Sequence, residues 1–301
     1  MPGWAPEPAA GDPAVWHIRG RTVDLGRPVV VGVLNVTPDS FSDGGVYLEP
    51  AAAEERALSL AAEGADLIDI GAESTRPGAP AVPADEEWDR LAPVLERLRR
   101  SLAVPLSVDT TKAIVAERAL ELGAAVINDV SGLEVEPRIG RLAAESGAGL
   151  VLMHRRGDPR TMQRDVEYAD LIAEVRASLE RSIDAAVSAG CSRKQLVVDP
   201  GIGFGKSPEG SLRLLAEVGK FGSLDVPIMV GPSRKSFIGM LLDLPVHERL
   251  EATIGACVVA LERGARLFRV HDVGPARRAL DLAEAIRRAG AAEDAPAGAP
   301  R

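Results

Sequence analysis

The sequence predicts an α/β fold in which eight strands alternate with helices and close into a (β/α)8 TIM barrel. Three observations support this prediction. Eight short apolar runs, rich in β-branched residues, each end at a polar cluster. A helical pattern with terminal signals follows each run. The eight units fill about 260 residues, which is the size of one barrel domain.

A doubly wound open sheet is the alternative arrangement of the same elements. Such a sheet gathers its ligand-binding groups near one switch point, whereas here a polar cluster follows every strand. In a barrel, all strand ends converge on one mouth. We therefore expect the functional site at the carboxyl ends of the eight strands.

The predicted strands are nearly continuous apolar runs, as a parallel sheet buried on both faces requires. They cover residues 29–34, 66–70, 106–108, 125–127, 150–153, 196–198, 226–230 and 267–268. A weaker alternation over residues 15–25, interrupted at Arg19 and Gly20, predicts a short N-terminal hairpin or edge ribbon before the barrel.

Helix boundaries follow from capping residues, glycines and prolines. Thr110 or Thr111 is expected to cap the third helix, and Ser207 with Pro208 forms an N-cap and N1 pair. The helix over residues 167–189 is expected to be the longest. The predicted helices cover residues 51–63, 86–100, 110–122, 137–147, 167–189, 250–263 and 275–288, with two more opening at residues 208 and 236.

Composition limits the class of protein. A chain of 301 residues, 46% hydrophobic and 26% charged, fits one globular domain over residues 14–290, between disordered segments 1–13 and 291–301. The net charge of −9 and the lack of a basic stripe argue against nucleic-acid binding. Cys191 and Cys257 suggest neither a disulfide framework nor a metal site. We find no signal peptide and no long apolar span, so we expect a cytoplasmic protein without membrane contact.

Two long polar loops follow the first two strands. Residues 35–45 form a hydrogen-bonding loop with terminal glycines, which favours a lid over a substrate rather than a plain surface turn. The second loop carries Glu73, Thr75 and Arg76 before a Pro-Gly turn. Anion capture by Arg76 and a solvated turn are equally compatible with this second motif.

Three acceptor side chains end three further strands: Asp109, Asn128 and Asp199. Asp109 and Asp199 could each cap the helix that follows. Their convergence on one barrel mouth favours a binding role instead, because carboxylate and amide oxygens accept N–H donors from a heterocycle. We expect a nitrogen-rich ring to bind between them.

Residues 199–206 are rich in glycine but lack the GxxxxGK[ST] spacing of a phosphate-binding P-loop. The glycines are more consistent with a backbone passing close beneath a flat ligand, with Phe204 as a packing face.

Cations follow the last two strands, in the segment 231–236 and at Arg269 and His271. Barrels commonly bind phosphate with these loops, although a solvated basic rim is the alternative. The histidines are too scattered for a permanent zinc site. A Mg²⁺ ion carried by a diphosphate, and touching Asn35, is the expected metal.

The motifs together resemble the dihydropteroate synthase family, within the pterin-binding TIM-barrel superfamily. The matching segments run in order from the first strand to the eighth: LNVTPDSFSDGG (34–45), ESTRPGA (73–79), SVDT (107–110), INDVSGL (127–133), TMQ (161–163), DPGIGFGK (199–206), SRKSFIG (233–239) and RVHDV (269–273).

This resemblance implies an alkyl transferase that condenses a dihydropterin methyl diphosphate with 4-aminobenzoate in folate synthesis, and a sulfonamide target. It implies a homodimer with Mg²⁺ as cofactor. The implied pterin-binding residues are Asp109, Asn128, Met153, Asp199 and Lys235. The implied diphosphate-binding residues are Asn35, Arg269 and His271, of which Asn35 also meets the metal.

The implied contacts of 4-aminobenzoate are Phe41, Thr75, Arg76, Pro77, Phe204 and Ser236. The implied catalytic residues are Asp109, Asp199, Lys235 and Asp43. Asp39 or Asp43 is expected to stabilise the carbon cation that forms as diphosphate leaves, and preorganised charges would then carry the catalysis.

Several positions depart from the family pattern: Ala72, Arg155, Arg156, Ser211 and Pro232. None coincides with an implied pterin or diphosphate contact, so activity is expected. Two rival hypotheses remain. One is a folate-binding methyltransferase of the same superfamily, which would not need the anion-binding and lid motifs. The other is a non-catalytic paralogue that binds pterin or a partner.

Overall fold

The computed structural model describes residues 15–37, 49–74, 79–157, 161–162 and 166–293. Eight parallel strands form the centre, in the order β8-β7-β6-β5-β4-β3-β10-β9. A parallel bridge between Val198 and Ile228 joins the two ends, so the sheet closes into the predicted barrel. The strands are β3 (Val29–Asn35), β4 (Leu67–Gly71), β5 (Leu106–Asp109), β6 (Val126–Asp129), β7 (Gly149–Met153), β8 (Leu196–Asp199), β9 (Met229–Val230) and β10 (Leu267–Val270).

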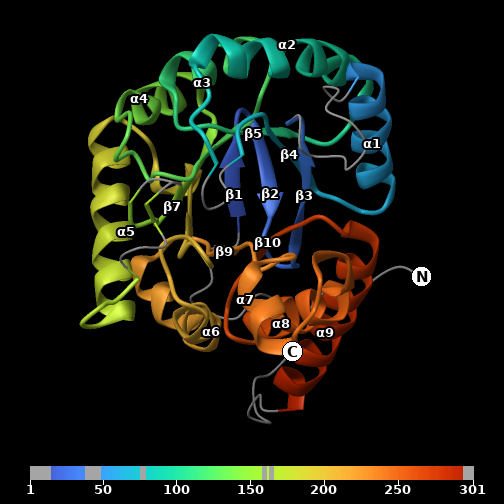
Figure 1. Ribbon diagram of the computed structural model, residues 1–301, viewed down its shortest axis with the longest axis vertical. Helices are drawn as coiled ribbons and strands as arrows, with labels where there is room; N and C mark the ends of the chain where they lie inside the picture. Colours follow the sequence, from blue (N-terminus) through green and yellow to red (C-terminus); the bar gives the residue numbers. More distant parts are fainter. Residues whose placement is uncertain (1–14, 38–48, 75–78, 158–160, 163–165, 294–301) are drawn as a thin grey trace, which may run out of the picture.

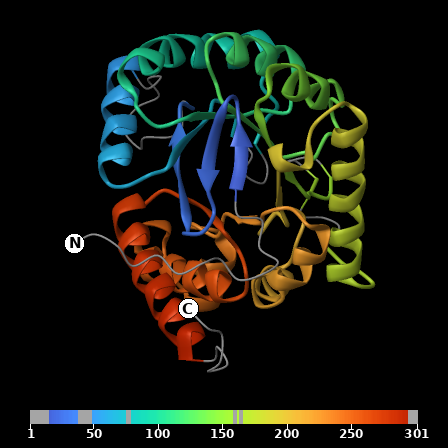
Figure 2. The same cartoon turned by 180° about the vertical axis from the view of Figure 1, so that it is seen from behind.

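Helices surround the strands as an outer ring (Figure 1). The same ring is seen from behind in Figure 2. The α-helices are α1 (Pro50–Ala62), α2 (Ala84–Ser101), α3 (Ala113–Glu121), α4 (Arg138–Ser146), α5 (Leu171–Ser188), α6 (Pro208–Ala216), α7 (Ser236–Leu242), α8 (Leu250–Glu262) and α9 (Val273–Glu293). None of the helices in the described segments is long and apolar enough to cross a membrane.

Period-two alternation divides β3 and β4 between two cores. Val30, Ile68 and Ile70 face outward and pack in the large core beneath the helices. Val31 and Leu67 face inward and belong to a smaller core inside the barrel. Since both faces are buried, the strands have the continuous apolar character that predicted them.

The N-terminal hairpin, β1 (Val15–Ile18) and β2 (Arg21–Asp24), closes the amino ends of the strands. Trp16 is buried in the inner core with Val126 and Leu267, which begin β6 and β10. Its Nε1 donates to Gln195 O at 2.8 Å. A Cβ on Gly149 would overlap the indole, so only glycine at the start of β7 admits Trp16.

Some predicted boundaries were wrong. Helix α3 begins at Ala113, after an N-cap at Lys112, and Thr110 Oγ1 instead accepts from Lys112 N in the preceding turn. Helix α5 begins at Leu171 because Asp170 accepts from Ala173 N as its N-cap. Helix α9, with 21 residues, exceeds α5 in length and extends to Glu293, into the tail predicted over residues 291–301. Segment 1–13 lies outside the described residues.

Candidate functional site

The interior of the barrel changes from apolar to polar toward the carboxyl ends of the strands. At the hairpin end the inward residues are apolar: Leu67, Val126 and Leu267. Two residues further along the same strands stand Asp69, Asn128 and Arg269. Because alternate residues of a strand face the same side, these three also point inward. Asp69, Asn128 and Arg269 therefore form a polar layer at the base of the barrel mouth, here called the polar floor. The apolar layer lies beneath it, toward the hairpin.

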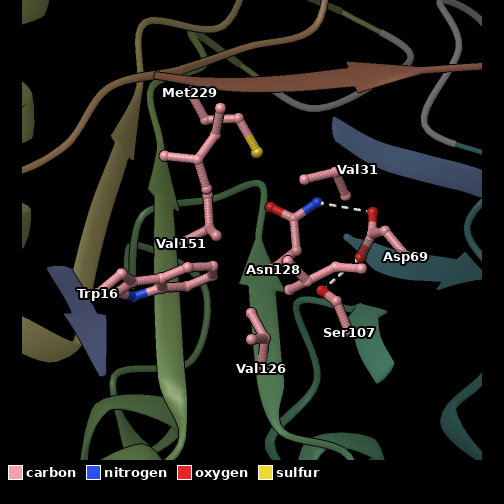
Figure 3. Close-up of a pocket in the computed structure, with 10 residues that line it drawn as sticks. Trp16, Val31, Asp69, Ser107, Val126, Asn128, Val151 and Met229 are labelled. Carbon is pink, nitrogen blue, oxygen red and sulfur yellow. Dashed lines mark hydrogen bonds between the residues drawn. The ribbon is translucent and has the colours of Figure 1, made fainter. Parts of the chain in front are cut away.

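Asp69 is the centre of this floor, and two of its hydrogen bonds are drawn in Figure 3. Its Oδ1 accepts from Ser107 Oγ at 2.6 Å, and its Oδ2 accepts from Asn128 Nδ2 at 3.1 Å. Arg269 Nε donates to the same Oδ2 at 2.7 Å. The carboxylate is buried, so these three donors compensate for its lost hydration. A cavity of about 10 Å³ separates this network from Trp16.

Arg269 connects the floor to Asp109. Its Nη2 donates to Asp109 Oδ2 at 3.1 Å. Burial raises the pKa of Asp109 to about 7, against the attraction of Arg269 and with added repulsion from Asp69. The predicted separation of acceptors on β5, β6 and β8 from cations on the last two strands is therefore incomplete, because Arg269 contacts the acceptor group directly.

Asn128 offers an acceptor that the described part of the protein leaves unused. It is the register partner of Asp109 across β5 and β6. Its Nδ2 is bound to Asp69, whereas its Oδ1 is buried and has no hydrogen-bond partner among the described residues. An unpaired buried acceptor is unfavourable in the free protein. A ligand with an N–H group at this place would relieve that cost.

Asp199 ends β8 and fixes the loop that follows it. Its Oδ1 accepts from Gly201 N at 2.7 Å. Burial raises the pKa of Asp199, with the Gly201 hydrogen bond and the Lys235 charge opposing the shift. Gly201 has φ +71, and a Cβ there would overlap the main-chain oxygen of His154. Glycine is thus required at this close crossing of two loops.

Lys206 joins the same two loops from beneath. Its Nζ contacts His154 O at 3.0 Å, Pro200 O at 2.9 Å and His154 Nδ1 at 2.7 Å. Burial, followed by the Lys206 charge, lowers the pKa of His154 to about 2, so the imidazole is neutral and its Nδ1 can accept a hydrogen bond from the Lys206 amine. The buried Lys206 amine therefore fixes the glycine-rich loop against the loop that carries His154.

Lys235, an implied pterin contact, lies over Phe204, an implied contact of 4-aminobenzoate. The Lys235 Nζ is 3.7 Å from the centre of the Phe204 ring, which is a cation–π distance. Ser236 begins α7 and lines a cavity of about 340 Å³ that also touches Gly203. Met153 is buried at the end of β7, in register with Asp199.

The loops after β9 and β10 are bound to each other. Arg234 forms a two-pronged ion pair with Asp272, at 3.0 and 2.5 Å. Ser233 Oγ accepts from His271 N at 3.2 Å and lies 2.9 Å from His271 Nδ1. Burial, and then the charge of Arg269, lowers the pKa of His271 to about 3, so His271 is neutral.

Asn35 is the last residue of β3 and is partly exposed. The described residues contain no group of three His, Cys, Asp or Glu side chains that could hold a metal ion. Mg²⁺ commonly keeps several waters and binds through one or two protein oxygens plus substrate phosphates. The single amide oxygen of Asn35 fits an ion that arrives with a diphosphate.

Six predicted site residues lie outside the described residues: Asp39, Phe41, Asp43, Thr75, Arg76 and Pro77. Hydrogen bonds and ion pairs fix the chain on either side of residues 75–78. Glu73 Oε1 accepts from Val82 N at 2.9 Å, and Glu73 Oε2 pairs with Lys112 Nζ at 2.5 Å. Lys112 also pairs with the buried Glu87 at 2.5 Å. The second loop thus starts and ends at fixed points beside β5.

Four departures from the family pattern have visible contacts, and two of them are Ala72 and Arg156. Ala72 is buried, and its carbonyl accepts from Arg90 Nη1 at 2.8 Å. Arg156 lies 3.6 Å over the ring of Tyr168 and pairs with Glu174. Its guanidinium therefore has its partners outside the polar floor formed by Asp69, Asn128 and Arg269.

The other two are Ser211, which lines the cavity of about 340 Å³, and Pro232. Ser211 Oγ donates to Ser207 O at 3.0 Å within the first turn of α6. Pro232 supplies the carbonyl that accepts from Lys235 N at 3.3 Å, so it starts the turn that presents Lys235. Arg155, next to Arg156, is partly exposed.

Asp69 was missed by the sequence interpretation, which took it as part of an apolar run. One signal could have found it. Asp69 lies an even number of residues from Leu67 and Gly71, so it shares their face of β4, and a charge on an inward face needs a partner.

The chain matches the family model described as pterin binding enzyme over residues 31–271. A dihydropteroate synthase from Synechocystis is 44% identical over 263 residues, covering 87% of this chain and 91% of that protein. The crystal structure of the Yersinia pestis dihydropteroate synthase with a sulfonamide drug superimposes with a TM-score of 0.87 at 42% identity, covering 91% and 99% of the two chains. The Xanthomonas albilineans enzyme with 4-aminobenzoic acid gives 0.84 at 44% identity, covering 91% and 98%.

Proposed function

Since the chain belongs to the dihydropteroate synthase family of pterin-binding enzymes, we propose that it condenses dihydropterin methyl diphosphate with 4-aminobenzoate. The products are dihydropteroate and diphosphate, in the synthesis of tetrahydrofolate. The observation that best supports a pterin substrate is the unpaired buried oxygen of Asn128 beside Asp109. A pterin carries ring N–H and amino donors that match this pair of acceptors and Asp199.

The reaction breaks the bond between the methylene carbon and the diphosphate oxygen and forms a bond from that carbon to the aryl nitrogen. The leaving diphosphate takes the electron pair, so Arg269 favours departure by attracting its charge and neutral His271 by donating a hydrogen bond from its ring N–H. The positive charge left on the pterin-bearing carbon is stabilised by nearby carboxylates. The neutral amine attacks and then loses its proton, which leaves no need for a strong general base.

Asp109, Asn128 and Asp199 hold and orient the ring, and Lys235 covers it. Positioning of the carbon against the amine carries much of the rate enhancement. Bound Mg²⁺ would neutralise part of the diphosphate charge, with Asn35 as its protein ligand. The residues proposed around 4-aminobenzoate are Phe41, Asp43, Thr75, Arg76, Pro77, Phe204 and Ser236.

An incubation of purified protein with both substrates and Mg²⁺ tests the proposal. Diphosphate release that requires 4-aminobenzoate supports it, and no release at micromolar enzyme refutes it. Methyl transfer from a methylated folate would favour the methyltransferase, whereas pterin binding without turnover would favour a non-catalytic protein. We also propose that sulfonamides compete with 4-aminobenzoate. A sulfonamide that saturates the enzyme without displacing 4-aminobenzoate would contradict this.

We further propose a cytoplasmic homodimer. Support for the dimer comes from exposed apolar side chains on neighbouring helices: Val259 of α8 and Leu282 and Ile286 of α9. A Leu282→Asp variant should elute as a monomer if this face forms the contact. An unchanged dimer would move the interface elsewhere, and a monomeric wild type would refute the dimer. Cell fractionation tests the location.

A further inference from the structure

Arg249 binds the main chain on which Lys235 is mounted. It lies between a 3-10 turn (Val246–Glu248) and α8. Its Nη1 donates to the carbonyl oxygens of Arg234 at 3.1 Å and Lys235 at 3.4 Å. Its Nε and Nη2 both donate to Leu244 O, at 3.0 and 2.9 Å. All four hydrogen bonds end on main-chain oxygens, so Arg249 constrains the path of the backbone.

The backbone at this place is strained and needs such a constraint. Arg234 has φ +58, in the left-handed region that non-glycine residues rarely adopt. Its N–H donates to Thr253 Oγ1 at 3.1 Å, and its side chain pairs with Asp272. Arg249 adds hydrogen bonds to the carbonyl oxygens of Arg234 and Lys235. The segment that carries Lys235 is therefore fixed at three places: the Arg234 N–H, the Arg234 side chain, and the carbonyl oxygens of Arg234 and Lys235.

Gly239 of α7 makes room for the guanidinium. A Cβ at Gly239 would overlap Nη2 and Cζ of Arg249. Glycine inside a helix costs about 1 kcal/mol relative to alanine. The space it leaves is filled by Arg249, so the two residues form a matched pair.

We propose that Arg249, seated against Gly239, is a positioning residue for Lys235 in the condensation reaction. It fixes where the Lys235 amine stands over Phe204 and beside Asp199. The inference rests on the proposed function, in which Lys235 contacts the pterin. Lysine at position 249 would carry the charge but not the planar fork that reaches three carbonyls, so it would restore only part of the effect.

The test compares Arg249→Ala, Arg249→Lys and Gly239→Ala with Arg263→Ala, an exposed arginine at the end of the same helix. We expect Arg249→Ala to lower kcat/KM for the pterin diphosphate by about 10-fold to 100-fold, since small displacements of a positioned group have effects of this size. Arg249→Lys should retain more activity than Arg249→Ala. Gly239→Ala should fold and show a loss in the same direction, and Arg263→Ala should match the wild type.

Double variants separate positioning from general damage. In a Lys235→Ala background, Arg249→Ala should cause no further loss of kcat/KM, whereas an equal loss in both backgrounds would overturn the proposal. In an Arg249→Ala background, Gly239→Ala should likewise add nothing.

Amide hydrogen exchange gives a readout that does not depend on turnover. The amides of Lys235 and Ile238 donate to Pro232 O and Lys235 O. Arg249→Ala should speed their exchange selectively, and unchanged exchange would overturn the inference even if the wild type proved inactive. An inactive wild type with faster exchange in the variant would instead count against the proposed function alone.

Discussion

Asp109→Asn is expected to increase stability at pH 8 while lowering activity. In the free protein Asp109 and Asp69 face a single guanidinium, that of Arg269. The ordinary pKa of the carboxyl is 3.8, and burial raises the pKa of Asp109 to about 7. At about 1.36 kcal/mol for each pKa unit, ionised Asp109 costs the folded state at most about 4 kcal/mol. Asparagine removes that charge and leaves Arg269 paired with Asp69.

The sign of the pH dependence follows from the raised pKa. The folded protein keeps a proton on Asp109 between about pH 4 and pH 7, where the unfolded chain has lost it, so wild-type stability falls across this window and is level above it. The Asp109→Asn variant lacks this pH-dependent contribution to the free energy of unfolding. Its advantage should therefore be near zero at pH 4, grow up to pH 7, and stay constant at higher pH. Roughly half of the maximum, about 2 kcal/mol, is expected after local relaxation.

Urea unfolding from pH 4.5 to 8.5 measures this difference, and Asp184→Asn on the exposed face of α5 is the matched control. A wild type that is more stable than Asp109→Asn at pH 8, or a difference independent of pH, would refute the reasoning. Turnover should fall at least ~10-fold in the variant, because a neutral amide binds N–H donors more weakly than a carboxylate.

Four further variants test other parts of the structure. Lys235→Ala and Asp199→Asn should each lower kcat/KM at least ~10-fold with little change in melting temperature; unfolding of both variants would show that they serve the barrel instead. Trp16→Ala should cost about 3–5 kcal/mol in urea unfolding while kcat/KM of the folded fraction is kept, and a stability loss below ~1 kcal/mol would contradict the packing described for the hairpin. Gly201→Ala should lower both stability and pterin affinity, because the loop must move away from His154 and take Asp199 with it; calorimetric binding at wild-type affinity would disprove this link.

The strand endings predicted the fold and much of the mouth. Asp109, Asn128 and Asp199 could be located because each stands where an apolar run stops, and parallel strands bring such stops together. Asp69 could not be located in this way because it lies inside its run, where the sequence shows one charge among apolar residues. Its importance depends on Arg269, which is 200 residues away along the chain and adjacent only after the barrel closes.

The contacts of Arg249 could not be predicted from the sequence either. Its partners are backbone oxygens of Arg234, Lys235 and Leu244, which every residue type provides, so no side-chain pattern marks them. The strained φ of Arg234 is equally invisible in the sequence, since non-glycine residues at such angles are uncommon. Motifs identify the groups that meet a ligand more readily than the contacts that hold those groups in place.

The hairpin has a consequence for the order of events during synthesis. Chains emerge from the ribosome N-terminus first, so β1 and β2 are made before any strand of the barrel. Trp16 nevertheless packs against Leu267 and donates to Gln195 O, which are translated much later. The Trp16 indole can therefore complete its packing only when nearly the whole chain exists. Full burial of the Trp16 indole is thus a natural spectroscopic marker for completion of the barrel.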